Sequence, residues 1–355
     1  MIKVIMVGPA RNVKGGMSTV VNNYFNYGLD HDFNLKYVET INDGNKINKF
    51  IKEKLGFLTF LFNIIKYDIV HIHMASRRST FRKIMYIKIS KFFKKKIVLH
   101  IHGGGFKKFF DEECNIKQKK YIKKYLNYCD KIIVLSEEWF EYFKYLVDRS
   151  KICVIYNGVD VPSKKEKEFI DKNILFLGRI EKDKGIYELI DAINVLVKKD
   201  PDVKLYIGGS GESNRLNEVI KNYKLEKNVI LLGWINDEEK KKYFELCSNF
   251  ILPSYFEAMP MSLLEAMANS CVVIATNVGG IPHVINNRIN GILINPKKID
   301  EIVKVVDELF DNKKLNLTLS NNAYLTVLEK FNINGNIDSI KKIYYELIER
   351  DYNEK

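Results

Sequence analysis

The chain has 355 residues, of which 46% are hydrophobic, which excludes a disordered protein and leaves room for two domains with separate cores. Its five cysteines contain no C-x-x-C pair, which excludes a disulfide framework or a cysteine zinc site and is typical of a reducing cytoplasm. The formal charge of +13 is uneven, because residues 1–160 carry 29 Lys and Arg against 15 Asp and Glu. This asymmetry predicts an anionic partner for the first half alone.

Short β-branched runs alternate with longer helical stretches along the chain. Eleven runs have the pattern of strands, at 3–7, 68–74, 96–102, 131–136, 151–156, 173–178, 203–209, 229–233, 249–254, 272–276 and 291–295. The alternation predicts α/β structure with parallel sheets covered on both faces. Eleven strands are too many for one compact sheet of this kind, so we predict two Rossmann-like domains.

The domain boundary is predicted in the polar run 160–169, where the net charge also changes. We expect an N-terminal domain over 1–160, a linker over 161–172, a C-terminal domain over 173–333 and a C-terminal helix over 334–355. That helix has one apolar side and is expected to pack back on the N-terminal domain; the side consists of Ile337, Ile340, Ile343, Tyr344 and Leu347.

No signal peptide or membrane span is predicted. The first apolar run is too short for a signal peptide, and the stretch 57–65 is far below the length that crosses a bilayer. We therefore expect a soluble, cytoplasmic protein.

Ligands of such folds bind where strands end and loops enter helices, so these loops hold the candidate site residues. After the first strand, Gly15 and Gly16 precede a helix whose free N–H groups can bind an anion, although a plain tight turn also explains them. The loop contains neither a P-loop nor a complete dinucleotide-binding motif.

Histidines end two later strands. His73 and His102 lie at the same predicted sheet edge, and the glycine run beginning at Gly103 leaves room for a ligand beside His102. A strand-end histidine is more commonly a hydrogen-bonded core residue. His71 shares a strand face with His73, and His100 with His102, which suits metal ligands, but no acidic or cysteine partner accompanies them.

The segment 77–96 is strongly basic, with nine cations and no acid. Phe81, Met85, Ile89 and Phe92 lie within one arc at helical spacing. Two interpretations remain open. The arc packs on the sheet and the lysines are solvated, or the helix docks on an anionic membrane surface.

In the second half, Arg179 and Lys184 flank a strand-to-helix turn in "FLGRIEKDKGI". Two cations at such a turn can bind a diphosphate, the Arg by its planar fork and the Lys as a point charge, although exposed cations are common on any surface. The loop "YIGGSGE", with Gly208 and Gly209, occupies the equivalent place after the next strand and can lie beneath a nucleotide.

The stretch "YFEAMPMSLLEAMA" places two carboxylates around one helix start. Pro260 fits the first helical position, so Glu257 lies in the loop and Glu265 about a turn and a half inside the helix. Because helical side chains lean toward the N-terminus, Glu265 can point back at the loop. Acidic residues near a helix N-terminus are also favourable to the helix dipole alone.

Taken in order, these loops resemble the family-4 glycosyltransferases, whose GT-B fold has two Rossmann-like domains facing each other across a cleft. Most of the chain fits. The E-x₇-E pattern from Glu257 to Glu265 is the most specific element, and "GRIEKDKGI", "NGVD" (157–160) and the early Gly-Gly loop support it.

The resemblance implies a role for each matching residue. The residue matching Glu265 holds the ribose hydroxyls of the nucleotide, and the one matching Glu257 meets the donor sugar near the reacting centre. Those matching Arg179 and Lys184 bind the diphosphate, and the one matching His102 contacts the donor sugar. Together, Glu257, His102, Arg179 and Lys184 are the expected catalytic residues.

Further site residues follow from the same resemblance, with Gly16 between the donor phosphate and the acceptor. The expected donor-binding set also includes Gly208, Gly209, Ala258, Met259, Pro260 and Met261. The expected acceptor side includes Gly15, Gly16, His73 and Gly103. Ala258 stands where the family often has glycine, which leaves the identity of the donor open.

The resemblance implies retaining transfer from a nucleotide-diphosphate sugar, with UDP as the expected carrier. The expected acceptor is a sugar on a lipid diphosphate, as in the synthesis of surface polysaccharides or glycolipids. The protein would then lie on the inner face of the cytoplasmic membrane, held there by 77–96. No cofactor and no metal are expected, since the D-x-D at Asp30 and Asp32 lies at the wrong end of the sheet for a metal–diphosphate clamp.

Two other classes of protein remain as alternatives. One is a nucleotide-sugar epimerase, or a phosphorylase, on a related two-domain fold. The other is a basic binder of nucleic acid or another polyanion, for which the sequence offers neither aromatic stacking platforms nor a helix-turn-helix. Such a binder has no need of Glu257 and Glu265, so we expect no nucleic-acid partner.

Overall fold

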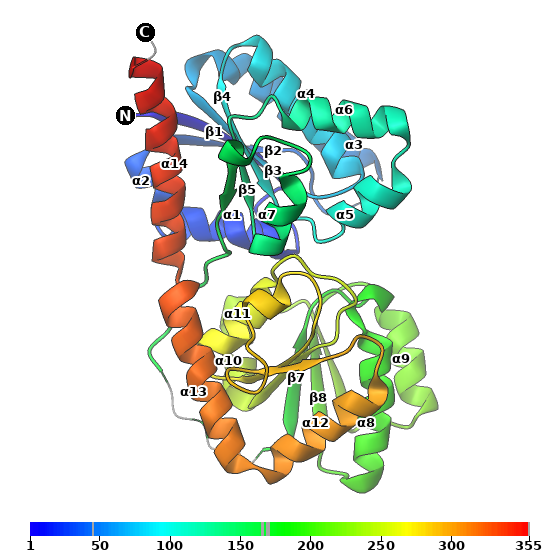
Figure 1. Ribbon diagram of the computed structural model, residues 1–355. Helices are drawn as coiled ribbons and strands as arrows, with labels where there is room; N and C mark the ends of the chain where they lie inside the picture. Colours follow the sequence, from blue (N-terminus) through cyan, green and yellow to red (C-terminus); the bar gives the residue numbers. More distant parts are fainter. Residues whose placement is uncertain (45, 165–166, 168–170, 354–355) are drawn as a thin grey trace. The chain divides into compact units, whose positions relative to one another are not determined.

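The computed structural model describes residues 1–44, 46–164, 167 and 171–353 (Figure 1). It divides the chain into two compact units. Unit 1 comprises Met1–Gly158 and Ile333–Lys355, and unit 2 comprises Val159–Asn332. Each unit is built on a six-stranded parallel sheet surrounded by helices, which confirms the predicted class of two Rossmann-like domains (Figure 1).

The sheet of unit 1 has the strand order β2-β1-β3-β4-β5-β6. Its strands are β1 (Lys3–Gly8), β2 (Asn34–Glu39), β3 (Ile69–Met74), β4 (Lys96–Ile101), β5 (Lys131–Val134) and β6 (Ile152–Val154). Strand β2 was missed in the sequence. It lies at the sheet edge, and only Val38 among its residues is buried, so it lacks the continuous apolar run of the central strands.

The helices of unit 1 are α1 (Gly16–Asn26), α2 (Leu29–Asp32), α3 (Lys46–Asn63), α4 (Arg78–Phe92), α5 (Phe106–Lys108), α6 (Ile116–Leu126), α7 (Glu137–Phe143) and α14 (Ile333–Asn353). The last of these, α14, packs on unit 1, as predicted. All five apolar residues of its predicted side are buried. Polar contacts add to this packing, since Asn336 donates to the carbonyl of Tyr156 at 2.5 Å and Lys341 pairs with Asp32 at 2.5 Å.

The sheet of unit 2 has the strand order β12-β11-β10-β7-β8-β9. Its strands are β7 (Asn173–Leu177), β8 (Lys204–Gly208), β9 (Val229–Gly233), β10 (Asn249–Leu252), β11 (Val272–Thr276) and β12 (Ile292–Ile294). Its helices are α8 (Ile186–Lys199), α9 (Ser213–Asn222), α10 (Asp237–Leu246), α11 (Met261–Ala268), α12 (Ile299–Asp311) and α13 (Lys313–Lys330).

The chain passes from one unit to the other slightly earlier than expected, between Gly158 and Val159. The backbone N–H of Val159 donates to the carbonyl of Phe331 at 2.9 Å, and the Tyr324 hydroxyl donates to the carbonyl of Pro162 at 3.0 Å. These bonds attach the start of the expected linker to unit 2. Within the expected linker 161–172, residues 165, 166 and 168–170 lie outside the described residues.

The basic segment 77–96 forms α4 and the start of β4. The members of its predicted apolar arc differ in burial. Phe81 and Ile89 are partly buried against the core of unit 1, whereas Met85 and Phe92 are 43% and 78% exposed. The arc lies at the flank of the helix, so the packing interpretation holds for two of its members. Lys83 is buried and donates to the Thr40 hydroxyl at 2.8 Å, so the cations are not all solvated.

Among the helices of the described residues, none combines the length and the apolar character needed to cross a bilayer.

Candidate active site

The loop from β7 into α8 holds both cations predicted to bind a diphosphate. Gly185 begins α8 with φ 67°, and a Cβ there would lie 2.0 Å from the carbonyl oxygen of Pro253. Only glycine fits, and it allows the loop to lie against the end of β10. The ammonium of Lys184 consequently forms an ion pair with Glu257. Arg179 instead lies 61% exposed and pairs with Glu181 at 3.0 Å.

Glu257 is held from a second direction. The hydroxyl of Ser254 donates to its Oε1 at 2.8 Å, and the hydroxyl of Thr276 donates to the carbonyl of Ser254 at 2.5 Å. The Glu257 side chain is only 11% exposed. A carboxylate with two donors and little solvent is oriented for a defined contact, and Lys184 supplies the positive charge that balances it.

A pair of glycines supports this loop and was missed in the sequence. Gly279 and Gly280 follow β11, and a Cβ on them would lie 1.8 Å from the carbonyl of Glu257 and 1.7 Å from that of Ala258. The backbone of the loop after β11 therefore lies directly against the backbone of Glu257 and Ala258, which helps to position Glu257. The signal was visible, because "NVGGIP" is a paired-glycine loop directly after a strand.

Helix α11 begins one residue later than predicted, at Met261, with Pro260 as its N-cap at φ −73° and ψ 122°. The extended ψ of Pro260 keeps it outside the helix. Among the described residues, no side chain caps this helix start. Ala258, Met259 and Met261 are buried around it. Uncapped N–H groups in an apolar surround can bind an anionic group of a ligand.

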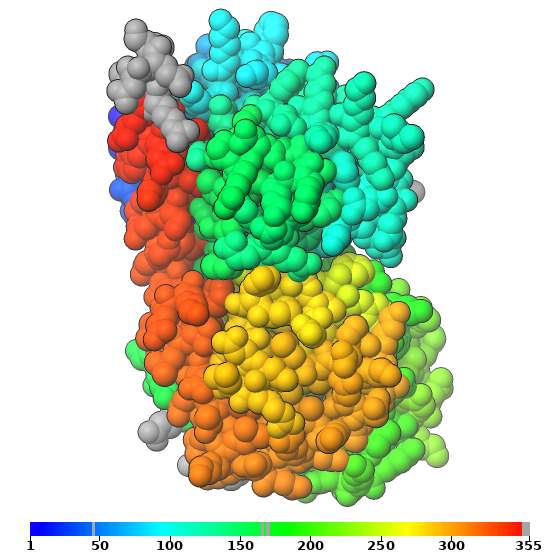
Figure 2. Space-filling model, viewed as in Figure 1, coloured from blue at the N-terminus to red at the C-terminus, as the bar shows by residue number. Residues whose placement is uncertain are grey.

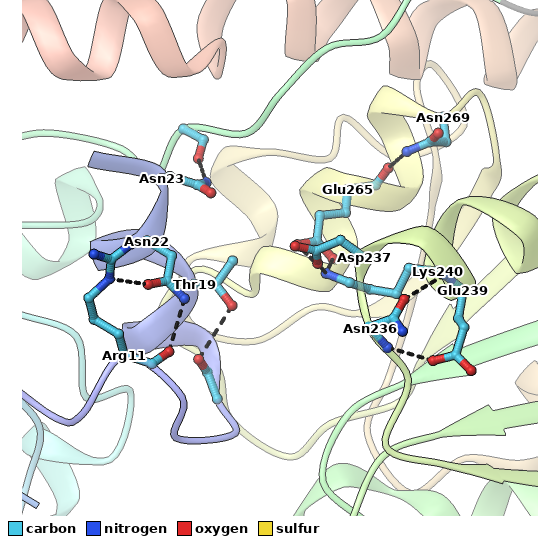
Figure 3. Close-up of polar contacts among 12 residues, drawn as sticks. Arg11, Thr19, Asn22, Asn23, Asn236, Asp237, Glu239, Lys240, Glu265 and Asn269 are labelled. Carbon is cyan, nitrogen blue, oxygen red and sulfur yellow. Dashed lines mark hydrogen bonds and ion pairs between the residues drawn. The ribbon is translucent and has the colours of Figure 1, made fainter. Parts of the chain in front are cut away.

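Glu265 meets a lysine that the sequence did not reveal. Lys240, on α10, donates to both carboxylate oxygens of Glu265 at 3.0 and 3.1 Å, and it also pairs with Asp237 at 2.8 Å (Figure 3). Burial alone would lower the pKa of Lys240, but the carboxylates of Glu265 and Asp237 outweigh burial and raise it. Lys240 therefore stays charged and fixes the orientation of Glu265. Its spacing in the sequence carries no signal of this pairing.

The glycine loop after β8 lies directly against the loop after β7. A Cβ on Gly209 would lie 1.8 Å from the carbonyl of Gly178, and one on Gly208 would lie 2.6 Å from the side chain of Leu177. The N–H of Ile180 donates to the carbonyl of Ser210 at 2.9 Å. The contact between the two loops accounts for Gly209 before any ligand is considered, whereas Gly208 meets only the ends of flexible side chains.

In unit 1, the loop after β1 is tied to α1. Gly15 is the N-cap of α1, and the N–H groups of Ser18 and Thr19 donate to its carbonyl. Arg11 and Asn22 bond each other, with the Arg11 Nε donating to the Asn22 side chain at 2.9 Å (Figure 3). Among the described residues, no atom lies within 4 Å of a Cβ built on Gly15, so the space beside this glycine is open.

Four histidines gather at the ends of β3 and β4. His73 lies opposite His100 in the strand register, and its Nδ1 is 2.8 Å from the Nε2 of His102. His71 lies deeper, with its Nδ1 2.5 Å from the Tyr344 hydroxyl of α14. The structure thus joins the two predicted site residues, His73 and His102, in one hydrogen bond.

These histidines are held in the neutral form. Burial lowers the pKa of His71 and of His102 to about 3, and lowers the pKa of His73 and His100 well below the ordinary value. A neutral imidazole can donate or accept a hydrogen bond to a sugar hydroxyl but adds no charge. Ring nitrogens of His71, His73 and His100 also lie within 4.8 Å of one another, so among the described residues these three could hold a metal ion.

Gly103, beside His102, is required by the fold. A Cβ there would lie 2.8 Å from the backbone nitrogen of Ser76, in the loop after β3. The close approach of these two loops explains this glycine, whereas a Cβ on Gly105 would be 3.6 Å from its nearest neighbour.

Comparisons with known proteins give matches to family models and to relatives along most of the chain. A family model described as "Glycosyltransferase Family 4" matches residues 27–162, and one described as "Glycosyl transferases group 1" matches residues 160–326. An uncharacterized 41.2 kDa protein in the cps region of Klebsiella pneumoniae is 28% identical, covering 84% of this chain and 88% of that protein. A UDP-Gal:alpha-D-GlcNAc-diphosphoundecaprenol alpha-1,3-galactosyltransferase of Escherichia coli is also 28% identical, covering 80% of this chain and 76% of that enzyme.

Solved structures share the fold. Sucrose-phosphate synthase from Thermosynechococcus elongatus matches with a TM-score of 0.84 at 17% identity, covering 99% of this chain and 100% of that one. Anabaena HepE, solved with UDP and glucose, matches with a TM-score of 0.77 at 16% identity, covering 97% and 99%. The fold is therefore that of the GT-B glycosyltransferases. With both family models matching in sequence, the chain belongs to the family-4 glycosyltransferases.

Proposed function

We propose that the protein is a retaining transferase that moves a sugar from UDP to a sugar acceptor on a lipid diphosphate. The observation that carries the donor part is the arrangement at the start of α11. Two carboxylates, Glu257 and Glu265, lie on either side of an uncapped helix start, and each is paired with a different lysine. Such a site offers acceptors to hydroxyl groups and donors to an anion at the same place.

Within this proposal, Glu265 accepts from the ribose hydroxyls and Lys240 holds it in place. Glu257 lies near the transferred sugar, and Lys184 and Arg179 stabilise the diphosphate. Because Lys184 is paired with Glu257 in the structure, a donor diphosphate would compete for its ammonium. Arg179 is exposed beside Glu181 and is free to turn toward a ligand.

The reaction breaks the bond between the sugar C1 and the diphosphate oxygen and forms a bond from C1 to the acceptor oxygen on the same face. The acceptor hydroxyl gives its proton to the leaving diphosphate. Negative charge grows on that diphosphate as the bond breaks, so the cations and the α11 amides lower the barrier. The step uses no metal, and the neutral His102 contributes a hydrogen bond to the donor sugar.

The acceptor and the setting are proposed from two observations. One relative acts, by its name, on a sugar carried on diphosphoundecaprenol, and another lies, by its name, in a cps region. The excess of positive charge in residues 1–160 suits an anionic acceptor. We place the protein in surface-polysaccharide synthesis, peripheral on the inner face of the cytoplasmic membrane.

The test starts from the purified protein and a panel of nucleotide sugars. The donor should raise the melting temperature, and its sugar should appear on a polyprenyl-diphosphate-linked acceptor with the anomeric configuration retained. Arg179→Ala and Lys184→Ala should each lower turnover at least about tenfold, because a diphosphate loses a charge-assisted bond worth ~1.5–3 kcal/mol. Near-normal turnover in both variants would refute the assigned site. Conversion of a donor incubated alone would instead indicate an epimerase.

A further inference from the structure

Helix α3 has an inward side that is fixed by close contacts with the rest of unit 1. Phe60 is buried in the core and Phe57 packs against it. A Cβ on Gly56 would lie 2.2 Å from the carbonyl oxygen of Glu39, so the helix backbone lies directly on the end of β2. These contacts determine which residues of α3 face away from the core.

The outward side of α3 is a stripe of apolar side chains, where a solvent-facing helix normally carries polar ones. The stripe recurs every three or four residues, so its members share one side of the helix and of the short turn that follows it. All are exposed, from 47% to 78%; they are Ile47, Ile51, Leu55, Leu58, Phe62 and Ile65. Single exposed apolar residues are ordinary, but a continuous stripe marks an interaction surface.

Helix α4 lies beside α3 and extends this surface (Figure 1). Arg82 pairs with Glu53 at 3.6 Å, and Lys95 donates to the carbonyl of Ile65 at 2.9 Å. A hollow of about 120 Å³ lies between the two helices. Met85 lines this hollow, and Phe92, seven residues on, lies along the same side of α4; both are exposed apolar side chains. We call the α3 stripe with Met85 and Phe92 the apolar face.

Positive charge surrounds the apolar face. Residues 47–66 contain four lysines against one glutamate, and α4 with its end adds the exposed Lys88, Lys91 and Lys94. Apolar side chains flanked by lysines match the boundary of an anionic bilayer, where the apolar groups enter the acyl region and the ammonium groups stay at the phosphates. A second copy of this chain would bring like charges together around the same stripe.

We propose that the apolar face inserts into the surface of an anionic lipid bilayer. This inference deepens the proposed function, because a lipid-linked acceptor is presented at such a surface. It also divides the membrane contact, predicted for 77–96 alone, between two helices. The cations of 77–96 attract the anionic surface, and α3 supplies most of the apolar contact.

Flotation of the full chain with vesicles tests the proposal. The wild type should bind vesicles of phosphatidylcholine mixed with phosphatidylglycerol and leave pure phosphatidylcholine largely free. Combining Leu55→Gln, Leu58→Gln and Phe62→Gln should lower the vesicle-bound fraction at least about tenfold. The matched control combines Leu317→Gln, Leu325→Gln and Leu328→Gln on α13, which are similarly exposed. It should bind as the wild type does.

Three results would overturn the proposal. They are a wild type that ignores anionic vesicles, an α3 variant that floats as well as the wild type, and a wild-type dimer that the α3 changes convert to monomer without any vesicle binding. Sugar transfer to a water-soluble acceptor, measured in parallel, distinguishes a failure of this inference from a failure of the proposed function. If transfer persists while vesicle binding is absent, the membrane inference and the proposed peripheral location fail while the transferase activity stands; if vesicles bind and no transfer occurs, the proposed activity alone fails.

Discussion

At the scale of single residues, each glutamate of the candidate site is balanced by a lysine from another part of unit 2. Glu257 is paired with Lys184 and accepts from Ser254, whereas Glu265 is paired with Lys240 alone among the contacts described here. A partly buried carboxylate loses its orientation, and some of its charge balance, when such a lysine is removed. The two pairs therefore give the glutamates separate environments and predict separate effects on binding and turnover.

Glu265→Gln should chiefly weaken the binding of UDP, because an amide is a poorer acceptor from ribose hydroxyls than a carboxylate. Glu257→Gln should bind UDP about as well as the wild type and turn over more slowly. Titration calorimetry with UDP measures the first effect, and a transfer assay measures the second. Lys240→Met should resemble Glu265→Gln, since it leaves Glu265 without its partner. An equal loss of UDP affinity in the Glu257 and Glu265 variants would contradict this division of roles.

At the scale of elements, β3 and β4 place four histidines side by side. The rings of His71 and His73 stack with centroids 4.5 Å apart, and those of His100 and His102 with centroids 4.0 Å apart. Neighbouring imidazolium charges would repel one another in this position, which adds to the effect of burial on the pKa values. The stability of this end of the sheet therefore depends on the four imidazoles being neutral.

The free energy of unfolding should fall as the pH is lowered from about 6.5 toward about 3. The pKa of His71 and His102 is about 3 in the folded chain against 6.5 for an ordinary histidine, so the unfolded chain takes up protons first in this range. At about pH 5 each such histidine should cost about 2 kcal/mol, and above about pH 7.5 it should cost almost nothing. Urea unfolding at about pH 5 and at about pH 7.5 measures this difference in the free energy of unfolding.

The matched variants for this measurement are His102→Gln and His31→Gln. His102→Gln removes one histidine with a lowered pKa and should reduce the pH-dependent loss. His31 is exposed on α2, and His31→Gln should leave the loss as it is in the wild type. If His102→Gln and the wild type lost the same free energy between the two pH values, buried neutral histidine would not be the cause.

At the scale of the whole molecule, the chain leaves unit 1 at Gly158 and returns to it at Ile333. Unit 1 is therefore complete only after the last helix has been added. The side of α14 that faces unit 1 brings Ile340 and Tyr344, both fully buried, and it also covers His71. Unit 2 is continuous in sequence and contains both glutamates of the candidate donor site.

A chain ending at Asn332 should therefore lose stability in unit 1 while unit 2 still binds UDP. The missing apolar side chains each contribute ~1.5–3 kcal/mol of burial, so the loss should amount to several kcal/mol. Thermal unfolding, with UDP-dependent stabilisation as the readout for unit 2, measures both effects. Lys341→Ala in the full chain is the control and should cost at most ~1 kcal/mol, as exposed ion pairs do. An unchanged unfolding midpoint in the shortened chain would contradict this account of α14.

The class of fold was accessible from sequence because it depends on local patterns. Apolar strand-length runs alternating with amphipathic stretches predict parallel sheets, and their number predicts two of them. The edge strand β2 escaped because a half-exposed strand has no continuous apolar run. Candidate loops were also accessible, since glycines and charges that follow strands can be identified without knowing what they contact.

The sequence by itself determined the two-sheet fold, the apolar side of α14 and the loops that carry the candidate residues. Only the tertiary structure decided what each of those residues meets. Lys240 reaches Glu265 across 25 positions and Tyr344 reaches His71 across 273, because strand order brings distant segments together. Gly103 and Gly209, expected to make room for ligands, also make room for neighbouring loops. Local spacing carries no record of such contacts, since they depend on which strands become neighbours in the sheet.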